Sequence, residues 1–283
     1  MSELPNDLGV ALAGVVQHAG AFATRVLFRP IVASTNDEAA ALAAGGAPEG
    51  TIVIAEEQTA GRGRRGRTWH SPAGAGVYFS IVFRPTGAES LTTQGGGSAT
   101  ALLTVMSGVA VAEGIRQASG LAVAIKWPND VVVEARVPVT GRARRRKLAG
   151  ILAEAAVTGE QLQHVIVGIG VNVREAPRPR EIVQLATSIE GELGRSCERG
   201  ALVAAIVAAL AFWRRRTLAG DLQAVLQRWR ELSPSSRGVR VGWEAQGRLR
   251  RGVTAGIDST GALLVDTPEG RERVVAGELS WEW

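Results

Sequence analysis

Blocks of apolar residues divide the first 233 positions into strands and helices. Short apolar runs of strand length occur at 26–32, 50–57, 77–84, 123–127, 131–134, 147–157 and 163–173. Apolar residues follow a helical spacing at 97–119, 202–218 and 221–232. Thr35 and Glu38 match a capping box before a further Ala-rich helix, which Gly45 and Gly46 would end. Short apolar runs favour buried strands and a 3.6-residue period favours helices, so this part predicts an α/β fold, a mixed sheet with flanking helices.

The pattern changes after residue 233. The segment SPSS at 233–236 is typical of a linker, and short alternating runs follow at 239–243, 248–257, 263–266 and 271–275. Turns rich in Gly and Asp separate these runs. The sequence therefore predicts two domains, an α/β domain at 1–233 and a small SH3-like β-barrel at 234–283.

Composition excludes several classes of protein. An apolar fraction of 46% over 283 residues is enough for a packed core, so the chain is not disordered. The single cysteine, Cys197, excludes an intrachain disulfide framework and fits a reducing compartment. The longest uninterrupted apolar run, at 201–213, is too short to span a bilayer, and Glu3 and Asp7 do not fit a signal peptide. We expect a cytoplasmic protein with no membrane partner.

Basic residues are unevenly used and unevenly placed. Of the 32 Lys and Arg residues, only Lys126 and Lys147 are lysines, which marks these two positions. Residues 58–88 hold five Arg and no acid, and residues 135–153 hold five Arg with Lys147 and no acid. Two basic loops on a chain of net charge +5 indicate a local anion site more than a general polyanion-binding face.

The segment GRGRRGRTW at 61–69 follows a predicted strand. Its glycines allow close approach of the backbone to a ligand, its arginines offer forked donors to phosphate or carboxylate, and Trp69 suits a planar group. A solvated basic loop, or an Arg/Gly segment that binds nucleic acid, explains the same composition. The lack of nearby acids favours an anionic ligand, because arginines without partners repel one another.

Three further segments carry polar groups at strand ends. KWPND at 126–130 places a lysine, an amide and a carboxylate at a sharp break, although an ordinary turn has this composition too. Lys147 follows three arginines, so it is either an anion clamp, a nucleophile or the end of a charge run. GIGVN at 168–172 would let a flat ligand approach, although strand packing is a commoner reason for such glycines.

Other common chemistries are absent from the sequence. There is no phosphate-binding GxxxxGK loop and no GxSxG nucleophile elbow. The three histidines are too scattered for a metal site, and Cys197 has no apparent partner. What remains is a set of Arg and Lys side chains around an anionic reaction centre. This arrangement suits adenylyl transfer.

The ordered set of segments resembles the biotin–protein ligase family. The STN segment at 34–36, Gln58 with 61–69, KWPND, KLAG at 147–150 and GIGVN carry the resemblance, strongly over about 26–175 and more loosely over the C-terminal barrel. The resemblance implies a class II synthetase-like biotin/lipoate ligase catalytic domain. It also implies ATP-dependent formation of biotinyl-5′-AMP and transfer of biotin to a lysine of a biotin carboxyl carrier protein.

The resemblance also implies roles for individual residues. Lys147 and Arg64 would be catalytic, and Lys147 would bridge the biotin carboxylate and the α-phosphate. Biotin would be held by Ser34, Thr35, Asn36, Gln58, Arg62, Gly63, Arg64, Lys147, Gly168 and Gly170. ATP and the adenylate would contact Arg67, Trp69, Lys126, Asn129, Asp130, Lys147 and Asn172. ATP and Mg²⁺ would be the cofactors, with Asp130 near the Mg²⁺ carried by the phosphates.

Some features depart from the family. The stretch between Asp130 and Lys147 is longer and more basic than the usual short hairpin, and only about 25 residues precede the first predicted strand. We therefore expect a ligase without the DNA-binding repressor domain, acting as a monomer or homodimer with no nucleic-acid partner. A lipoate–protein ligase and a non-enzymatic nucleic-acid binder are the alternatives.

Overall fold

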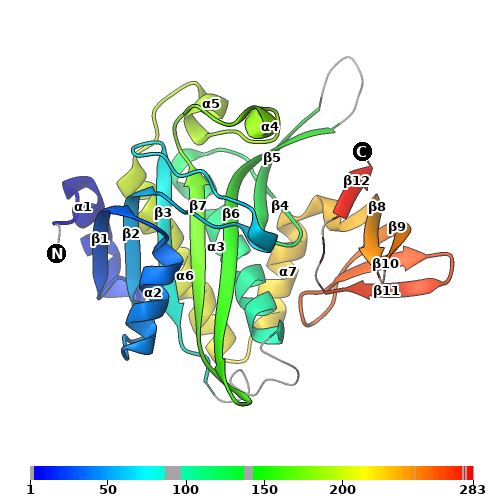
Figure 1. Cartoon of the computed structure of the whole chain (residues 1–283), viewed down its shortest axis with the longest axis horizontal. Helices are drawn as coiled ribbons and strands as arrows, with labels where there is room; N and C mark the ends of the chain where they lie inside the picture. Colours follow the sequence, from blue (N-terminus) through cyan, green and yellow to red (C-terminus); the bar gives the residue numbers. More distant parts are fainter. Residues whose placement is uncertain are drawn as a thin grey trace.

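A seven-stranded mixed sheet forms the centre of the larger domain, with strand order β1-β2-β3-β7-β6-β5-β4 (Figure 1). Only β1 and β2 pair in parallel; the other neighbours are antiparallel. This computed structural model describes residues 3–86, 97–136, 143–245, 247–275, 277 and 279–282. The strands are β1 (Val26–Val32), β2 (Ile52–Gln58), β3 (Gly76–Phe83), β4 (Ala124–Lys126), β5 (Asp130–Arg136), β6 (Ala143–Thr158) and β7 (Gln161–Asn172).

Helices cover both faces of this sheet, which confirms the predicted mixed sheet with flanking helices. The helices are α1 (Asn6–Ala19), α2 (Thr35–Ala44), α3 (Gly97–Ser119), α4 (Arg180–Val183), α5 (Ile189–Leu193), α6 (Arg199–Leu218) and α7 (Leu222–Leu232). Alternate residues of β2 enter different cores: Ile52 and Ile54 join the main core with α1, α3, α6 and α7, whereas Val53 packs with Ala39 and Ala43 of α2. The two-residue period of a strand thus supplies both layers.

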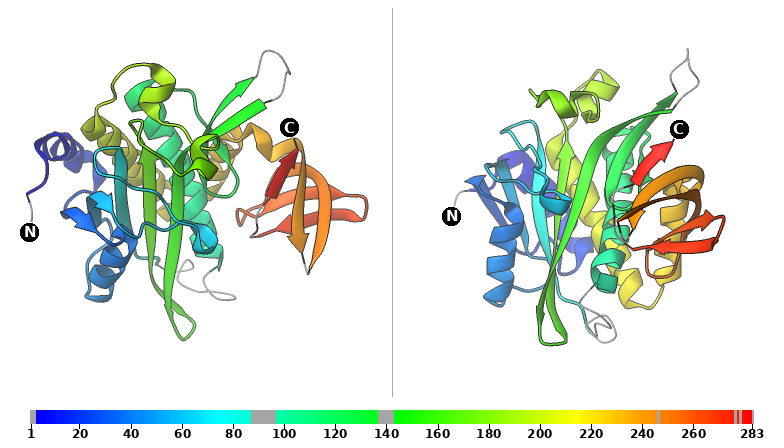
Figure 2. Two further views of the ribbon diagram at one scale, coloured as in Figure 1. Left: turned by 45° about the horizontal axis from the view of Figure 1, so that its top comes forward. Right: turned by 45° about the vertical axis from the view of Figure 1, so that its right-hand side comes forward.

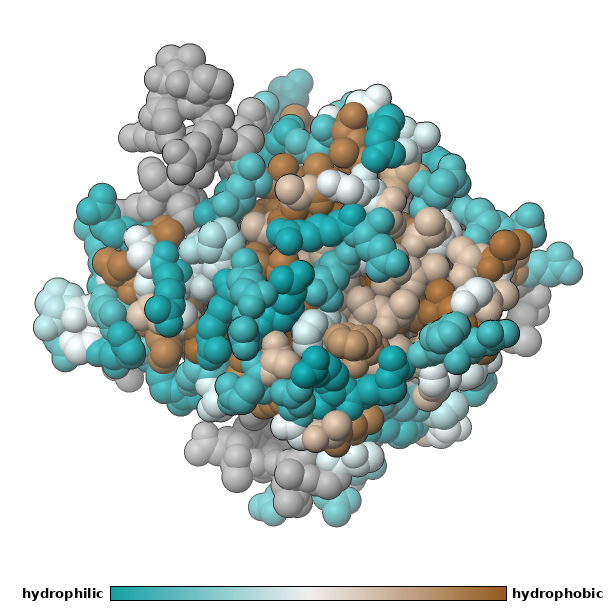
Figure 3. Space-filling view, turned by 180° about the vertical axis from the view of Figure 1, so that it is seen from behind, coloured by the Kyte–Doolittle hydropathy of each residue, from teal (hydrophilic) through white to brown (hydrophobic). Residues whose placement is uncertain are grey.

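The central helix α3 passes a simple test for a membrane span, because residues Ala99–Ser119 are long and apolar enough to cross a bilayer. Most of that window is buried inside the protein, as for the core helix of a globular domain. The outer surface of the helical layer mixes hydrophilic side chains with scattered apolar ones (Figure 3). Scattered apolar residues of this kind are ordinary for a protein surface.

The C-terminal residues form a second, five-stranded antiparallel sheet with order β11-β10-β9-β8-β12 (Figure 2), which confirms the predicted SH3-like module. Its strands are β8 (Arg237–Ala245), β9 (Arg248–Ile257), β10 (Leu263–Thr267), β11 (Gly270–Val274) and β12 (Leu279–Glu282). The indole Nε1 of Trp127 donates to the Gly261 carbonyl at 3.0 Å in a buried contact. This hydrogen bond joins the module to the turn before β5. The domain boundary at 233/234 stays a prediction.

The connection between the two domains is packed rather than exposed. Pro234–Ser236 form a short 3₁₀ turn, η3, and the side chains of Ser233, Ser235 and Ser236 are all buried. A linker was predicted because Ser and Pro are common in exposed segments. Tertiary packing decides otherwise here, since the turn lies between β4, α7 and the C-terminal strands.

One local interpretation of the sequence is wrong. The Thr35–Glu38 capping box does not form: the cap of α2 is Ser34, Thr35 bonds Gln58, and Glu38 pairs with Arg29 at 2.5 Å. Tertiary partners compete successfully for both side chains. The helix α1 was not predicted, although Leu8, Leu12 and Ala19 fall on one face with a helical spacing and are buried. Its tight packing on α6 is visible at Gly200, where an added Cβ would lie 2.3 Å from the Asp7 carbonyl oxygen.

Candidate functional site

Two adjoining cavities lie where the N-terminal end of α2, the 59–75 loop and strands β6 and β7 meet. The outer cavity has a volume of about 420 Å³ and the inner one of about 50 Å³. Five residues line both: Gly63, Arg64, Trp69, Asn129 and Lys147. The two cavities therefore adjoin at these residues.

The structure brings together at the two cavities every site residue that the sequence predicted. The inner cavity is lined by all the residues expected to hold biotin: Ser34, Thr35, Asn36, Gln58, Arg62, Gly63, Arg64, Lys147, Gly168 and Gly170. The outer cavity is lined by all those expected to contact the adenylate: Arg67, Trp69, Lys126, Asn129, Asp130, Lys147 and Asn172. Lys147 lies where the groups meet.

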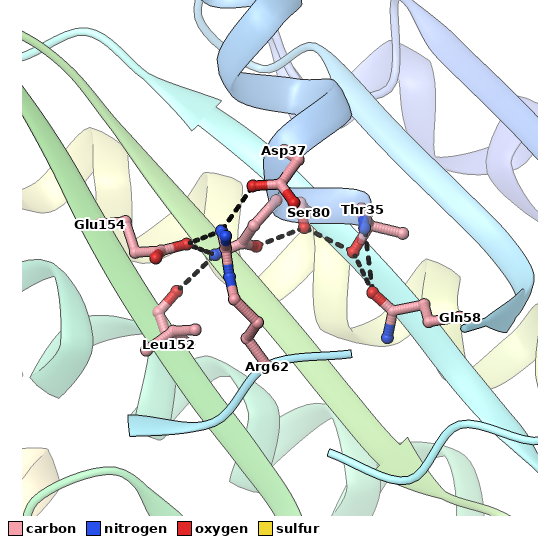
Figure 4. Close-up of polar contacts among 8 residues, drawn as sticks. Thr35, Asp37, Gln58, Arg62, Ser80, Leu152 and Glu154 are labelled. Atoms are coloured by element: carbon pink, nitrogen blue, oxygen red, sulfur yellow. Dashed lines mark hydrogen bonds and ion pairs between the residues drawn. The ribbon is translucent and has the colours of Figure 1, made fainter. Parts of the chain in front are cut away.

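A network of short polar contacts builds the inner cavity (Figure 4). The backbone N–H of Thr35 donates to Gln58 Oε1 at 2.9 Å, and the Thr35 hydroxyl lies 3.1 Å from the same oxygen. The Asn36 amide donates to Glu154 at 2.5 Å. Ser80 of β3 lies 2.7 Å from the Thr35 hydroxyl and 2.6 Å from Asn36 Oδ1. These buried groups hold the STN segment in one arrangement.

The arginine loop is less free of acids than its sequence suggests. Arg62 forms ion pairs with Asp37 of α2 at 2.7 Å and with Glu154 of β6 at 2.8 Å. Arg145 pairs with Glu134, and Arg146 pairs with Glu192, in the second basic segment. The expectation that the arginines of the 61–69 segment lack acidic partners is wrong for Arg62, because its acids come from distant parts of the chain.

Arg64 lies deeper in the site. Burial lowers the pKa of its guanidinium below its ordinary value, while the nearby Asp130 opposes that shift. A partly desolvated guanidinium binds an anion more strongly than one in water, because less solvent screens the interaction. Arg64 is thus suited to an anionic ligand placed between the two cavities.

Two glycines of β7 let polar and aromatic side chains lie directly on the sheet. A Cβ at Gly168 would be 2.2 Å from Asn36 Oδ1, and one at Gly170 would be 2.4 Å from Trp69 Nε1. The Trp69 indole therefore lies against β7 at the wall of the inner cavity, whose volume of about 50 Å³ leaves room for only a few water molecules. Its Nε1 is buried and has no hydrogen-bond partner within the part of the chain that the structure describes.

Lys147 is held in position at a β-bulge. The register between β5 and β6 shifts at Val131/Val132, and Lys147 pairs with Val132. Its backbone also bonds the 185–187 segment, through Leu185 O at 2.7 Å and Thr187 N at 2.9 Å. Its ammonium lies 2.6 Å from Asp130 and 5.2 Å from the centre of the Trp69 ring. The bulge re-aims this side chain into the junction of the cavities.

The remaining predicted residues line the outer cavity with different partners. The Asn129 amide donates to the Ile151 carbonyl at 2.7 Å, and the Asn172 amide donates to the Thr187 carbonyl at 2.9 Å. Both amides thus fix backbone segments at the cavity wall. The Lys126 ammonium lies 5.8 Å from the centre of the Trp281 ring of β12. Of the basic loop expected at 135–146, residues 137–142 lie outside the described residues, and its flanks belong to β5 and β6.

Several residues of the site were missed by sequence reasoning. Ser80 and Glu154 belong to the inner polar network, and Arg174, Arg178 and Trp281 line the outer cavity. A serine within the apolar run at 77–84 and an acid within the strand at 147–157 were the available signals. No sequence signal marks Trp281, because its contact with Lys126 at the outer cavity depends on the placement of the second domain.

Comparison with known proteins agrees with this geometry. The Biotin/lipoate A/B protein ligase family matches residues 29–172, and the biotin protein ligase C-terminal domain matches residues 238–280. The biotin–[acetyl-CoA-carboxylase] ligase of Paracoccus denitrificans is 35% identical over 255 residues, which cover 87% of this chain and 96% of that relative. The chain belongs to the biotin protein ligase family.

Further relatives include the bifunctional ligase/repressor BirA of Bacillus subtilis, 32% identical over 90% of this chain and 73% of that protein. Among solved structures, the biotin protein ligase of Aquifex aeolicus in complex with biotin and ATP matches with a TM-score of 0.73 at 25% identity, covering 92% of this chain and 99% of that one. The Leishmania major ligase bound to biotinyl-5-AMP matches with a TM-score of 0.56 at 26% identity. The ligase-family matches thus extend over both domains.

Proposed function

We propose that this member of the biotin protein ligase family activates biotin with ATP as biotinyl-5′-AMP and transfers biotin to one lysine of a biotin carboxyl carrier protein. The observation that carries the proposal is the pair of adjoining cavities that meet at Lys147. The inner pocket offers the hydroxyls and amides of Ser34, Thr35, Asn36 and Gln58, which suit the polar ring of biotin. The outer pocket, with many basic residues, suits a nucleotide. The junction is where a carboxylate and an α-phosphate would meet.

The first half-reaction joins two anions. The biotin carboxylate attacks the α-phosphorus of ATP, a P–O bond forms, and pyrophosphate leaves. Lys147 and Arg64 are placed at the junction to offset the negative charge that concentrates there. Lys147 has to exchange its contact with Asp130 for one with the reacting oxygens.

In the second half-reaction, the amine of the carrier lysine attacks the acyl carbon, and AMP leaves with its phosphate oxygen. Lys147 and Arg64 would again stabilise the charge on the departing phosphate. Trp69 and Arg67, on the loop that borders both pockets, would cover the adenylate and exclude water.

The acidic groups of the site fit magnesium carried by a nucleotide. Within the described ranges, no group of three His, Cys, Asp or Glu side chains is placed to hold a metal ion. Mg²⁺ commonly binds through one or two carboxylates together with substrate phosphates, and Asp130 supplies one such carboxylate at the outer cavity. Bound Mg²⁺ would neutralise charge on the leaving pyrophosphate.

The cellular setting is part of the same proposal. We propose a cytoplasmic enzyme, monomeric or homodimeric, whose macromolecular partner is the carrier protein and not a nucleic acid. The pairing of Arg62, Arg145 and Arg146 with acids supports this view, since these side chains are not arranged as an open basic face.

The decisive experiment incubates the protein with biotin, MgATP and a biotin carboxyl carrier domain and measures the carrier by mass spectrometry. We expect a mass gain of one biotin on one lysine, and none when biotin is replaced by lipoate. A carrier in which that lysine is replaced by Arg is the matched control. Lipoylation instead of biotinylation would contradict the proposed substrate, and no modification with either acid would contradict the proposed activity.

A further inference from the structure

Strand β6 runs along both cavities. Its residues 150–152 line the inner cavity, Lys147 lines both cavities, and Arg145 lines the outer cavity. Alternate residues of a strand face the same side, so Arg145 and Lys147 share one face of β6, about 7 Å apart along the strand. β6 therefore carries one basic side chain at the junction of the cavities and a second one farther out.

The geometry of the first half-reaction gives this second position a meaning. When one oxygen displaces another at phosphorus, the attacking and leaving oxygens lie roughly in line on opposite sides of the phosphorus atom. In the proposed function, the biotin carboxylate attacks from the inner cavity and the α-phosphate lies at Lys147. The leaving pyrophosphate then lies in the outer cavity, on the side of Lys147 away from residues 150–152. Arg145 is on that side.

The Arg145 side chain is held against this wall by the neighbouring strand. It is only 10% exposed, and its Nε–H donates to the Glu134 carboxylate of β5 at 2.5 Å. A guanidinium has five N–H donors in a fixed fork, and this contact uses the one at Nε. Glu134 is not among the described residues that line the outer cavity. The ion pair thus orients the guanidinium without adding an acid to the cavity wall.

The charges around the outer cavity favour an anion with several negative charges. Among the described residues that line it, Asp130 is the only acid, and it is paired with Lys147 at 2.6 Å. Burial lowers the pKa of the Arg145 guanidinium below its ordinary value, while Glu134 opposes that shift. Arginine stays charged at neutral pH, and a partly desolvated charge attracts an anion more strongly than one in water. Arg145 is therefore suited to phosphate oxygens, which match its fork of donors.

We propose that Arg145 binds the β- and γ-phosphates of ATP and holds the pyrophosphate that leaves in the first half-reaction. This inference rests on the proposed function. The family resemblance gives no role to Arg145, which belongs to the long basic stretch between Asp130 and Lys147. Its contribution is confined to the adenylation step, because no pyrophosphate takes part in the transfer of biotin to the carrier.

Reversal of the adenylation step by pyrophosphate tests this role in the full chain. An oxygen of pyrophosphate attacks the α-phosphorus of biotinyl-5′-AMP, a P–O bond to pyrophosphate forms, the P–O bond to the biotin carboxylate breaks, and ATP and biotin result. Arg145→Gln removes the charge but keeps a side chain that can bond Glu134. It should raise the KM for pyrophosphate, and the KM for ATP in the forward direction, by about 10- to 100-fold, since each loses a charge-assisted hydrogen bond. Arg145→Lys restores the charge and should recover part of this loss.

The matched control is Arg146→Gln. Arg146 is the next residue of β6, it pairs with Glu192 at 2.6 Å, and it is not among the described residues that line either cavity. Both KM values should stay native in this variant. In Arg145→Gln, the dissociation constant of biotin, inhibition by AMP and single-turnover transfer from preformed biotinyl-5′-AMP to the carrier should also stay native, because none of them involves the β- and γ-phosphates.

Glu134→Gln separates a contact with the ligand from a purely structural ion pair. It keeps an acceptor for Arg145 and removes the competing negative charge, so pyrophosphate should bind at least as well as to the native protein. A loss equal to that of Arg145→Gln would mean that the ion pair only braces the β5–β6 hairpin, and it would overturn the inference.

The other outcomes are equally distinct. Native KM values for pyrophosphate and ATP in Arg145→Gln would overturn the inference. An equally large loss of inhibition by AMP would also overturn it, because Arg145 would then contact the nucleoside or the α-phosphate. If the native protein forms no biotinyl-5′-AMP from biotin and ATP, the proposed function itself is wrong.

Discussion

Gly168 of β7 lies directly beneath the Asn36 side chain, and its replacement by alanine should disable biotin binding. A Cβ at this position would be 2.2 Å from Asn36 Oδ1 and 3.0 Å from its Cγ, whereas ordinary contacts begin near 3.4 Å. Asn36 must therefore move by about 1.2 Å. Such a shift breaks or strains its contacts with Ser80 and Glu154, which are 2.6 and 2.5 Å long.

The size of the effect follows from these lost contacts. A neutral hydrogen bond contributes about 1 kcal/mol and one to a charged group about 1.5–3 kcal/mol. Losing both corresponds to about 2.5–4 kcal/mol. Because biotin binds the arrangement of Asn36 that these contacts hold, this cost corresponds to a factor of about 70 to 900 in its dissociation constant. Some relaxation of β7 will absorb part of the clash, so we expect biotin to bind to Gly168→Ala at least about 30-fold more weakly.

Isothermal titration calorimetry with biotin is the direct assay, and thermal unfolding without ligand reports whether the variant folds. Gly14→Ala is the matched control: Gly14 lies within α1 with nothing within 4 Å of an added Cβ. It should bind biotin normally and gain about 0.5–1 kcal/mol in stability, because alanine favours a helix. A dissociation constant for Gly168→Ala within threefold of the native value would refute the reasoning.

Four further predictions address other parts of the molecule. Lys147→Ala should slow adenylate formation about 100- to 1,000-fold, measured by biotin-dependent ATP–pyrophosphate exchange, and a normal rate would contradict its catalytic role. Trp69→Ala opens the inner cavity, so biotin alone should bind no more weakly by calorimetry, and a tenfold loss would mean that the indole contributes to the pocket instead of filling it. Burial lowers the pKa of His164 below 6.5, so the neutral ring is favoured in the folded protein; its contribution to stability is present above pH 6.5 and lost as the pH falls below it. Urea unfolding at pH 8 and pH 5.5 should show a smaller pH effect in His164→Gln, and an unchanged effect would exclude this residue as the cause. Trp127→Phe removes the donor to Gly261 and should cost about 1–2 kcal/mol in unfolding free energy, and an unchanged value would show that this contact does not stabilise the protein.

The contrast between Lys147 and Arg62 shows which site features are readable from sequence. Lys147 was singled out because lysine is so rare in this chain, and it lies at the junction of the two cavities. Arg62 was assigned to an anionic ligand because no acid is near it in sequence, yet it pairs with Asp37 and Glu154. These two acids are 25 and 92 positions away in the sequence, so only folding brings them into contact with Arg62.

Sequence by itself determined the layout of the chain and many of the residues that line the two cavities. Apolar runs and helical periods record which backbone can bury its side chains, so strands such as β7 and helices such as α3 are visible locally. The order of the STN, Arg/Gly, KWPND, KLAG and GIGVN segments identified the family, and these segments line both cavities.

Only the tertiary structure decided the partners of those residues. Thr35 and Glu38 fit a local capping box, but Gln58 and Arg29 bind them instead, because a folded chain offers partners that no local window contains. Ser80 became part of the site for the same reason, through contacts with a helix that begins 45 positions earlier in the sequence. The sequence decides which donors, acceptors and charges each side chain carries. The partners of these groups depend on neighbours that only folding brings close.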